Sequence, residues 1–250
     1  MLKRIAKIIL PKYVIKKLNI INNNYFDGYA LKSYSQEGED MILRRLFEKQ
    51  KKGFYVDIGA HHPKRFSNTF FFYKNGWRGI NIDAMKNSMY LFNKIRPRDI
   101  NIEIPISDKK QKQKYYMFNE PALNTFSNEI AAKRNNKDIY NIICEKEMET
   151  STLEEIFNRY LPSGQEIDFM SIDVEGLDLQ VLKSNDWSRF RPKFVLVEML
   201  NCSIKDIAIS RTYKYLSEFE YDFFAKTLNT VFFQRVDIKD QSLVAKTQKI

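Results

Sequence analysis

Short runs of apolar residues alternate along the chain with segments of helical periodicity, and polar or turn-forming residues separate them. The apolar runs have the length of buried strands and occupy residues 53–59, 80–83, 100–106, 167–173 and 194–198. Helices are expected after Ser35, from the capping box at Thr152 through about Tyr160, and near 204–218. Strands separated by helical segments predict a mostly parallel sheet with helices on both faces.

The expected fold is therefore α/β, a three-layer sandwich that closes with an antiparallel hairpin at 221–226 and 230–235. Neither an internal repeat nor a glycine- and serine-rich linker divides residues 27–236, which we expect to form one domain. The segment 108–148 breaks the regular rhythm, being rich in lysine and asparagine, and is interpreted as an insertion over the site. Residues 237–250 would form a C-terminal tail.

Composition removes several classes of protein. A hydrophobic fraction of 44% over 250 residues is enough for a sizeable core, which excludes wholesale disorder. Two cysteines can form neither a disulfide framework nor a zinc site made of cysteines alone. The apolar runs are all shorter than the ~18–20 residues that span a bilayer. We therefore expect a cytoplasmic enzyme.

The net charge of +10 first suggests a nucleic-acid partner. Six basic residues lie in residues 1–26, before Asp27, the first acid, so the rest of the chain carries only +4. This basic N-terminal segment has apolar residues among its lysines, and Pro11 interrupts any helix there. It fits either a helix packed on the domain or an amphipathic helix on an anionic surface, which would place the enzyme peripherally at the inner membrane face. Without a recognisable nucleic-acid motif, a nucleic-acid partner is disfavoured.

Acidic residues end several of the expected strands, at the edge where parallel sheets bind ligands. Asp57 is followed by a loop whose one glycine, Gly59, argues against a dinucleotide, which needs several glycines for its pyrophosphate. S-adenosylmethionine carries no phosphate and demands less of that loop. Asp83 ends the next strand, where it can accept hydrogen bonds from ribose hydroxyls. The alternative is that these acids cap neighbouring helices.

The most specific pair of candidate catalytic residues is Asp173 and Glu175, which flank a valine at the end of a strand. Either acid can serve as the general base for methyl transfer to an alcohol, or can bind a divalent ion that acidifies the hydroxyl. The alternative for Glu175 is a cap on the following helix. His61 and His62, the two histidines of the chain, lie in the loop after Gly59 and face the expected cofactor region.

Five short motifs occur in order along the sequence: Ser35-Gln36-x-Gly38-x-Asp40, Val56-Asp57-Ile58-Gly59-Ala60, Arg65-Phe66-Ser67-Asn68-Thr69, Gly76-Trp77-x-Gly79-x-x-Ile82-Asp83 and Ile172-Asp173-Val174-Glu175-Gly176. Together they resemble the FkbM family of S-adenosylmethionine-dependent methyltransferases, over about two-thirds of the chain. The resemblance implies a class I methyltransferase fold, Rossmann-like, with seven strands that are parallel apart from one. It also implies O-methylation, often of sugar hydroxyls.

The resemblance further implies roles for individual residues. The cofactor would contact Asp57 and Gly59 at its methionine end, Asp83 at its ribose and Ser107-Asp108 near its adenine, while Gln36 and Asp40 would help to close the site. The sequence His61-His62-Pro63 departs from the asparagine-containing loop of many members, so assignments in that loop do not transfer simply. We take His61 as a cofactor contact and Asp173, Glu175 and His62 as the catalytic candidates.

The predicted function is S-adenosylmethionine-dependent O-methylation of a sugar hydroxyl, with S-adenosylhomocysteine as product and a divalent metal left open. The acceptor would be a nucleotide-activated sugar or a surface-polysaccharide precursor, since the amides and tyrosines of the insertion suit hydroxyl-rich ligands. One alternative is an RNA 2′-O-methyltransferase, prompted by the net charge. Another is a membrane-attached binding protein on a degenerate methyltransferase scaffold, prompted by residues 1–26.

Overall fold

The computed structural model describes residues 11–238, which divide into two compact units between Ser33 and Tyr34. The first unit contains helix α2 (Lys12–Tyr25), which begins directly after Pro11. Proline fits this position because the first residues of a helix need no N–H donor. The expectations for residues 1–10 and for most of the C-terminal tail lie outside the described residues.

The second unit is built on a seven-stranded sheet with the order β3-β2-β1-β6-β7-β9-β8. Its strands are β1 (Phe54–Ile58), β2 (Arg78–Asp83), β3 (Ile100–Glu103), β6 (Phe169–Ile172), β7 (Phe194–Glu198), β8 (Tyr221–Lys226) and β9 (Thr230–Arg235). Every neighbouring pair is parallel except the two that involve β9, which runs antiparallel to both β7 and β8. The predicted sheet with its terminal hairpin is confirmed.

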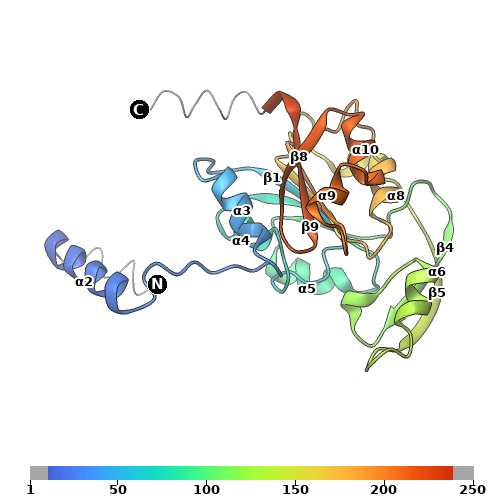
Figure 1. The fold of residues 1–250 in the computed structure, drawn as a ribbon, viewed down its shortest axis with the longest axis horizontal. Coiled ribbons are helices and arrows are strands. Elements are labelled where there is room, and N and C mark those ends of the chain that lie inside the picture. The colour runs from blue at the N-terminus through green and yellow to red at the C-terminus, as the bar shows by residue number, and fades with distance from the viewer. Residues whose placement is uncertain (1–10, 239–250) are drawn as a thin grey trace. The chain divides into compact units, whose positions relative to one another are not determined.

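Helices cover both faces of this sheet (Figure 1), as the three-layer prediction requires. They are α3 (Glu39–Leu46), α4 (Phe70–Lys74), α5 (Ser88–Ile95), α7 (Leu153–Tyr160), α8 (Asp178–Lys183), α9 (Ile204–Ile207) and α10 (Arg211–Ser217). The side chains of α7, α8 and α10 join one core cluster, and those of α3 and α4 join an aromatic cluster on the other face. Strand β1 is buried on both faces: Val56 packs in the first cluster and Tyr55 in the second.

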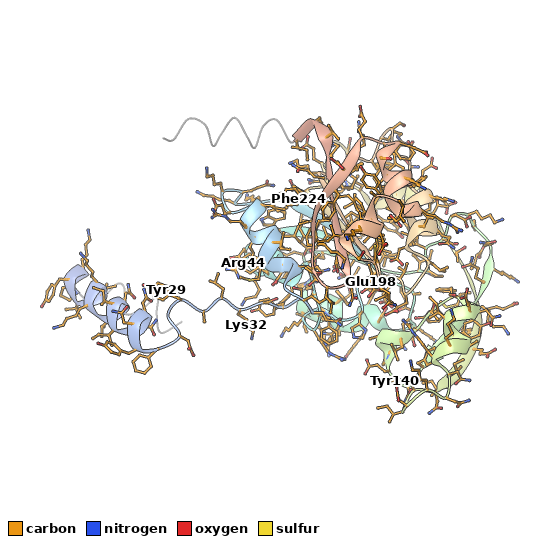
Figure 2. All side chains as sticks on the ribbon, viewed as in Figure 1. Tyr29, Lys32, Arg44, Tyr140, Glu198 and Phe224 are labelled. Atoms are coloured by element: carbon orange, nitrogen blue, oxygen red, sulfur yellow. The ribbon has the colours of Figure 1, made fainter. Side chains whose placement is uncertain are left out.

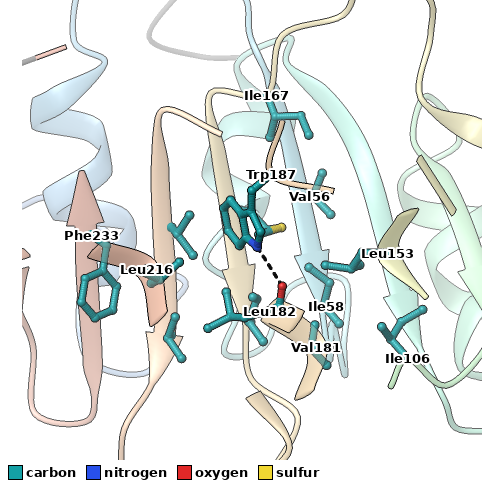
Figure 3. Close-up of a cluster of buried hydrophobic side chains, with 14 of the residues drawn as sticks. Val56, Ile58, Ile106, Leu153, Ile167, Val181, Leu182, Trp187, Leu216 and Phe233 are labelled. Carbon is teal, nitrogen blue, oxygen red and sulfur yellow. Dashed lines mark hydrogen bonds between the residues drawn. The ribbon is translucent and has the colours of Figure 1, made fainter. Parts of the chain in front are cut away.

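The core under α7, α8 and α10 is drawn in Figure 3, with aliphatic side chains such as Val56, Val181 and Leu182 packed around Trp187. The indole N–H of Trp187 donates to the carbonyl oxygen of Leu182 at 3.0 Å. The buried tryptophan therefore keeps its polar atom satisfied, as burial requires.

Within the second unit, the segment expected over the site forms a separate two-stranded sheet with a helix, beside the main sheet (Figure 1). It consists of β4 (Lys112–Phe118), the 3-10 turn η1 (Pro121–Leu123), α6 (Asn128–Arg134) and β5 (Ile142–Glu149), and β4 pairs antiparallel with β5. We call residues 108–149 the insertion.

One predicted helix is wrong in its extent. Residues 204–218 form two short helices, α9 and α10, rather than one. Ser210 interrupts them because its side chain accepts the backbone N–H of Tyr213 and so caps the start of α10. The chain ends its described part with a 3-10 turn, η2 (Val236–Ile238).

Candidate active site

A cavity of about 360 Å³ opens at the carboxyl ends of β1, β2, β6 and β7, and the insertion forms part of its wall. This is the edge at which open parallel sheets bind their ligands, and the volume lies in the range of small-molecule sites. Figure 2 labels Glu198, at the end of β7, and Tyr140, from the insertion, both of which line the cavity.

Asp83 ends β2 on one side of the cavity. Its two carboxylate oxygens accept the backbone N–H groups of His61, at 2.9 Å, and Met85, at 2.8 Å. Burial raises the pKa of this carboxyl group. Each oxygen retains a second lone pair, so Asp83 is held rigidly and can still accept hydrogen bonds from hydroxyl groups.

Gly59 brings the loops after β1 and β6 together. Its φ of +79° lies in the left-handed region, and a Cβ atom here would come within 1.7 Å of the carbonyl oxygen of Asp173. No other residue type fits without moving the backbone. The sequence signal of a single tight glycine turn is explained by this close approach.

Six of the eleven predicted site residues line the cavity, namely Gln36, Gly59, His61, Asp83, Asp173 and Glu175. Asp57 does not: it is buried beneath the loop, where it accepts the hydroxyl of Thr69 at 2.7 Å. Asp40 is also fully buried, and its carboxylate accepts the backbone N–H of Tyr34 and the hydroxyl of Ser35. These two acids shape the walls from behind and stay predictions as cofactor contacts.

The other predicted residues also lie outside the cavity lining. His62 accepts the backbone N–H groups of Lys64 and Arg65 on its Nδ1 atom, so its ring closes a local turn. Ser107 is buried and donates to the carboxylate of Asp108 at 3.2 Å. The cavity wall beside β3 is instead apolar, with Ile104, Pro105 and Ile106.

Three carboxylates meet on the opposite side of the cavity from Asp83's strand end. Asp173, Glu175 and Glu198 each offer an oxygen, and these oxygens lie within 4.8 Å of one another; no other such group occurs among residues 11–238. We call them the acidic triad. Hard divalent cations such as Mg²⁺ take carboxylate oxygens, so the triad is the set of described residues that could hold one.

Burial and mutual repulsion raise the pKa values of the triad. The pKa of Asp173 is raised well above its usual range by desolvation and then by the neighbouring charge of Glu198. The pKa of Glu198 is raised to about 8, chiefly by desolvation. Burial also raises the pKa of Glu175, but the charge of Arg134 opposes that shift. The three carboxyl groups of the triad therefore lose their protons at higher pH than exposed carboxyl groups do.

Contacts from the insertion hold the loop that carries Glu175. The guanidinium of Arg134, at the end of α6, lies 2.6 Å from the Glu175 carboxylate, and both side chains are largely buried. The hydroxyl of Thr125 donates to the backbone carbonyl of Glu175 at 2.8 Å. Glu175 itself has a φ of +54°, a strained conformation that persists only when the surroundings impose it.

The alternative that Glu175 caps the next helix is not what the structure shows. Helix α8 begins after Leu177 without a side-chain cap. The carboxylate of Asp178 instead accepts the backbone N–H groups of Val174 and Gly176, each at 3.2 Å. Glu175 is thereby left free to pair with Arg134 and to face the cavity.

Several lining residues were not among the predicted site residues. Glu198 is recognisable in the sequence as an acid that ends a strand. Because it lies 23 residues from Glu175 along the chain, the sequence did not indicate that the two carboxylates lie close together. Glu37 lines the cavity while its carboxylate accepts the backbone N–H and side-chain amide of Asn229, which ties the loop before α3 to the β8–β9 turn. Tyr115 reaches the cavity from β4 of the insertion.

The triad makes stability depend on pH in a defined direction. The folded protein retains a proton on Glu198 up to about pH 8, whereas the unfolded chain releases it near the ordinary glutamate value. The resulting stabilisation is complete below the unfolded pKa and is lost as the pH rises through about 8.

We therefore expect the melting temperature to fall between pH 5 and pH 8.5, and to fall less in Glu198→Gln, which cannot ionise. If the variant is destabilised by ~1 kcal/mol less than the wild type at high pH, its melting temperature there should fall by roughly 2–4 °C less, for a chain of this size. Differential scanning fluorimetry across that range measures the slope. As a control, Glu154→Gln on the exposed first turn of α7 should keep the wild-type slope. If the melting temperature of Glu198→Gln fell with pH as steeply as that of the wild type, the prediction would be contradicted.

Sheet order, helices on both faces and an acid-lined cavity at the strand ends define a Rossmann-like fold of the class I methyltransferase type. The sequence matches the methyltransferase FkbM domain over residues 57–223, about two-thirds of the chain. The chain therefore belongs to the FkbM methyltransferase family, and it is a methyltransferase.

Solved structures give distant similarities. A methyltransferase from Geobacter sulfurreducens has 10% identity and a TM-score of 0.40, covering 94% of this chain and 96% of its own. An O-methyltransferase from Bacillus cereus in complex with SAH has 12% identity and a TM-score of 0.42, covering 92% and 94%. Comparison with curated proteins found no significant match.

Proposed function

We propose that this protein is an S-adenosylmethionine-dependent O-methyltransferase whose acceptor is a sugar hydroxyl, carried by a nucleotide-activated sugar or a polysaccharide precursor. The observation that carries the proposal is one cavity with two unlike sides. A rigid hydrogen-bond acceptor, Asp83, faces two carboxyl groups whose pKa values are raised by burial, Asp173 and Glu198, so that their deprotonated forms are stronger bases than an exposed carboxylate. Methyl transfer needs both a cofactor pocket and a group that takes a proton.

The residues beside Asp83 fit the cofactor. Asp83 keeps lone pairs for ribose hydroxyls, and Gly59 leaves the loop without a side chain at its closest approach to β6. The Nε2 atom of His61 is buried without a hydrogen-bond partner in the described structure, although it borders the cavity. Burial lowers the pKa of His61, so a neutral imidazole is available to a polar ligand atom. A bound cofactor would satisfy that nitrogen.

Polar residues of the insertion suit a hydroxyl-rich ligand. Glu120, Asn124 and Tyr140 of the insertion line the cavity together with Arg65, whose guanidinium lies 3.6 Å from the Glu120 carboxylate. Acids, amides and tyrosines offer both donors and acceptors, which suits neighbouring sugar hydroxyls. Arg65 adds a positive charge to the cavity wall, which suits the phosphate of a nucleotide-linked sugar.

Chemically, the sulfonium cofactor supplies a methyl group that is already activated for in-line displacement. The protein has to align the acceptor oxygen and take its proton, and alignment is the larger contribution. We assign the proton to Asp173, whose side chain is exposed to the cavity and whose raised pKa makes its deprotonated form a stronger base. Glu198 lies beside it, and a hydrogen bond joins the two carboxyl groups when one of them is protonated.

A divalent cation is the competing role for the triad. Held by the three carboxylates, it would lower the pKa of a bound hydroxyl instead. Turnover that survives treatment with a chelator supports Asp173 as the base. Turnover that is lost with chelator and restored by added Mg²⁺ or Mn²⁺ assigns the triad to the cation.

The proposal is tested by incubating the purified protein with S-adenosylmethionine and a panel of nucleotide-sugars. Mass spectrometry should find a gain of ~14 Da on one acceptor, the mass of a transferred methyl group that replaces a proton. Calorimetry measures cofactor binding separately. Folded protein that binds neither S-adenosylmethionine nor S-adenosylhomocysteine would refute the proposal, and methylation of an RNA 2′-hydroxyl would replace the sugar by RNA.

Two matched variants locate the cofactor. Asp83→Asn should weaken S-adenosylmethionine binding by about 10- to 100-fold, because a hydrogen bond to a charged group contributes about 1.5–3 kcal/mol. Asp138→Asn changes the same chemical group at an exposed carboxylate outside the cavity lining and should bind as the wild type does. Equal affinities for both variants would remove Asp83 from the ribose site.

Arg134 acts on the reaction through Glu175 and is a positioning residue. Arg134→Gln removes the charge that lowers the pKa values of Glu175 and Glu198, so the acid limb of the pH–rate profile should move upward, on the order of one pH unit. Turnover should fall about tenfold. Arg134→Lys should restore the limb, and Lys133→Gln, which loses an exposed charge paired with Glu129, should leave it in place. An unmoved limb in Arg134→Gln would contradict this role.

A further inference from the structure

Helix α2 carries an apolar stripe that the described residues of its own unit leave largely exposed. Val14, Leu18, Ile21 and Tyr25 recur at intervals of four, three and four residues, which places them on one face of the helix. Leu18 is 50% exposed and Tyr25 is 77% exposed, and none of the residues of α2 is buried. An amphipathic helix whose apolar face is in water is stabilised when that face packs against another surface.

The charge around this stripe has one sign. Lys12 and Lys16 project from the opposite face of α2 and Lys17 from its flank, and the helix contains no acid. The sequence before the helix adds Lys3, Arg4 and Lys7. Such a helix is attracted to a negatively charged surface.

Aromatic side chains continue the exposed surface beyond the helix. Phe26 is 70% exposed and Tyr29 is 74% exposed, and Figure 2 shows the side chain of Tyr29 projecting from the chain. Tyrosine and other aromatic rings favour the boundary between lipid headgroups and acyl chains. The described part of the chain contains no helix that is long and apolar enough to cross a membrane.

We propose that residues 11–31, which we call the basic helix segment, bind in the plane of an anionic lipid surface. The apolar stripe would enter the boundary of the acyl chains, while the lysines would contact negatively charged headgroups. At 14 residues, α2 is about 21 Å long, enough to lie on a surface and too short for a bilayer core of about 30 Å.

Lipid explains the observations better than the two other partners that fit a basic helix. Nucleic acid would use the lysines but leaves the stripe of Val14, Leu18 and Ile21 in water. A second copy of α2 would cover the stripe, but it would bring like charges together without any acid to pair with them.

The test uses the full chain and sedimentation with vesicles of phosphatidylglycerol and phosphatidylcholine, compared with vesicles of phosphatidylcholine alone. We expect binding to the anionic vesicles that is at least about tenfold tighter than to the neutral ones and that weakens in 0.5 M salt. The measurement requires no methyl transfer, so its failure would leave the proposed function standing, and the reverse also holds.

Two sets of variants separate the apolar and the charged contribution. Leu18→Ser with Ile21→Ser keeps every charge and should weaken vesicle binding at least about tenfold, because both side chains lose their apolar contact. Replacing Lys12, Lys16 and Lys17 by glutamine should cost about fivefold for each lysine. The matched control replaces Lys109, Lys110 and Lys112 of the insertion by glutamine: these three are exposed, the net charge falls equally, and binding should stay at the wild-type level.

The outcomes decide the matter. Loss of vesicle binding in both α2 variants, with an unchanged melting temperature and an unaffected insertion control, supports the proposal. Equal binding to neutral and anionic vesicles, or wild-type binding by the Leu18 and Ile21 variant, overturns it. Binding to RNA without binding to vesicles would overturn it in favour of nucleic acid. A dimer that does not bind vesicles and that dissociates in the Leu18 and Ile21 variant would overturn it in favour of a second copy.

Discussion

Asp173→Asn should lower turnover by at least ~10²-fold while S-adenosylmethionine binding stays close to that of the wild type. Asparagine has the shape of aspartate but cannot take a proton from the acceptor hydroxyl. The side chain faces the cavity from the loop after β6, at the edge opposite Asp83, so the cofactor contacts that we assign to Asp83 are left in place. Single-turnover kinetics with the acceptor found by mass spectrometry, together with calorimetry, measures both quantities.

The matched control is Asp138→Asn. Asp138 is an exposed aspartate of the insertion with a φ of +56°, a conformation that asparagine adopts readily, and it should retain wild-type turnover. Wild-type turnover in Asp173→Asn would remove Asp173 from the role of base. A loss of turnover that is accompanied by an equal loss of cofactor affinity would mean that Asp173 binds the cofactor instead.

Glu198→Gln refines this experiment because a hydrogen bond joins the two carboxyl groups when one of them is protonated. If Asp173 is the base and Glu198 raises its pKa, the variant should shift the acid limb of the pH–rate profile to lower pH and retain part of the turnover. If the triad holds an essential cation, loss of either ligand should abolish turnover, and chelator should do the same to the wild type.

The parts of the site that could be predicted from sequence are those that local pattern determines. Asp83 ends a short apolar strand, Gly59 follows another, and Asp173 and Glu175 share one loop, so parallel strands necessarily bring them to one edge. The seven-stranded topology came from the motif resemblance, and the sheet of the structure has it.

What sequence reasoning missed depends on contacts across the fold. Arg134 stands 41 residues from Glu175, in a segment without regular rhythm, and nothing in its surroundings marks it as the partner of that acid. Asp57 stays a predicted cofactor contact, on the strength of its motif position. The structure points its side chain toward Thr69 and the charge of Arg96, on the same face of the sheet as Tyr55. Motif position did not show which way the side chain points.

Arg96 lies at the centre of a buried polar network beneath the cofactor loop. Its side chain is fully buried, its Nε atom lies 2.8 Å from the Asp99 carboxylate, and its Nη2 atom donates to the hydroxyls of Tyr55, at 2.8 Å, and Thr69, at 2.9 Å. Thr69 in turn donates to Asp57. The guanidinium therefore pairs with Asp99, is linked to Asp57 through Thr69, and fixes the segment that leads into α4.

Arg96→Met should reduce the free energy of unfolding by about 3–5 kcal/mol, because Asp99 would be left as a buried charge without its partner. Methionine fills a similar volume, so lost packing contributes little. Urea denaturation with an unchanged m-value measures the change. Arg96→Lys keeps the charge but loses the planar fork, and should fall between the wild type and Arg96→Met.

The contrast with an exposed ion pair makes this prediction sharp. Arg45 lies 2.6 Å from Glu48, a shorter distance than the 2.8 Å of the buried pair, yet its side chain is 80% exposed. Arg45→Met should therefore cost less than about 1 kcal/mol, since water already solvates both charges. A cost for Arg96→Met no larger than that for Arg45→Met would contradict the role of Arg96 as the partner that stabilises the buried charge of Asp99.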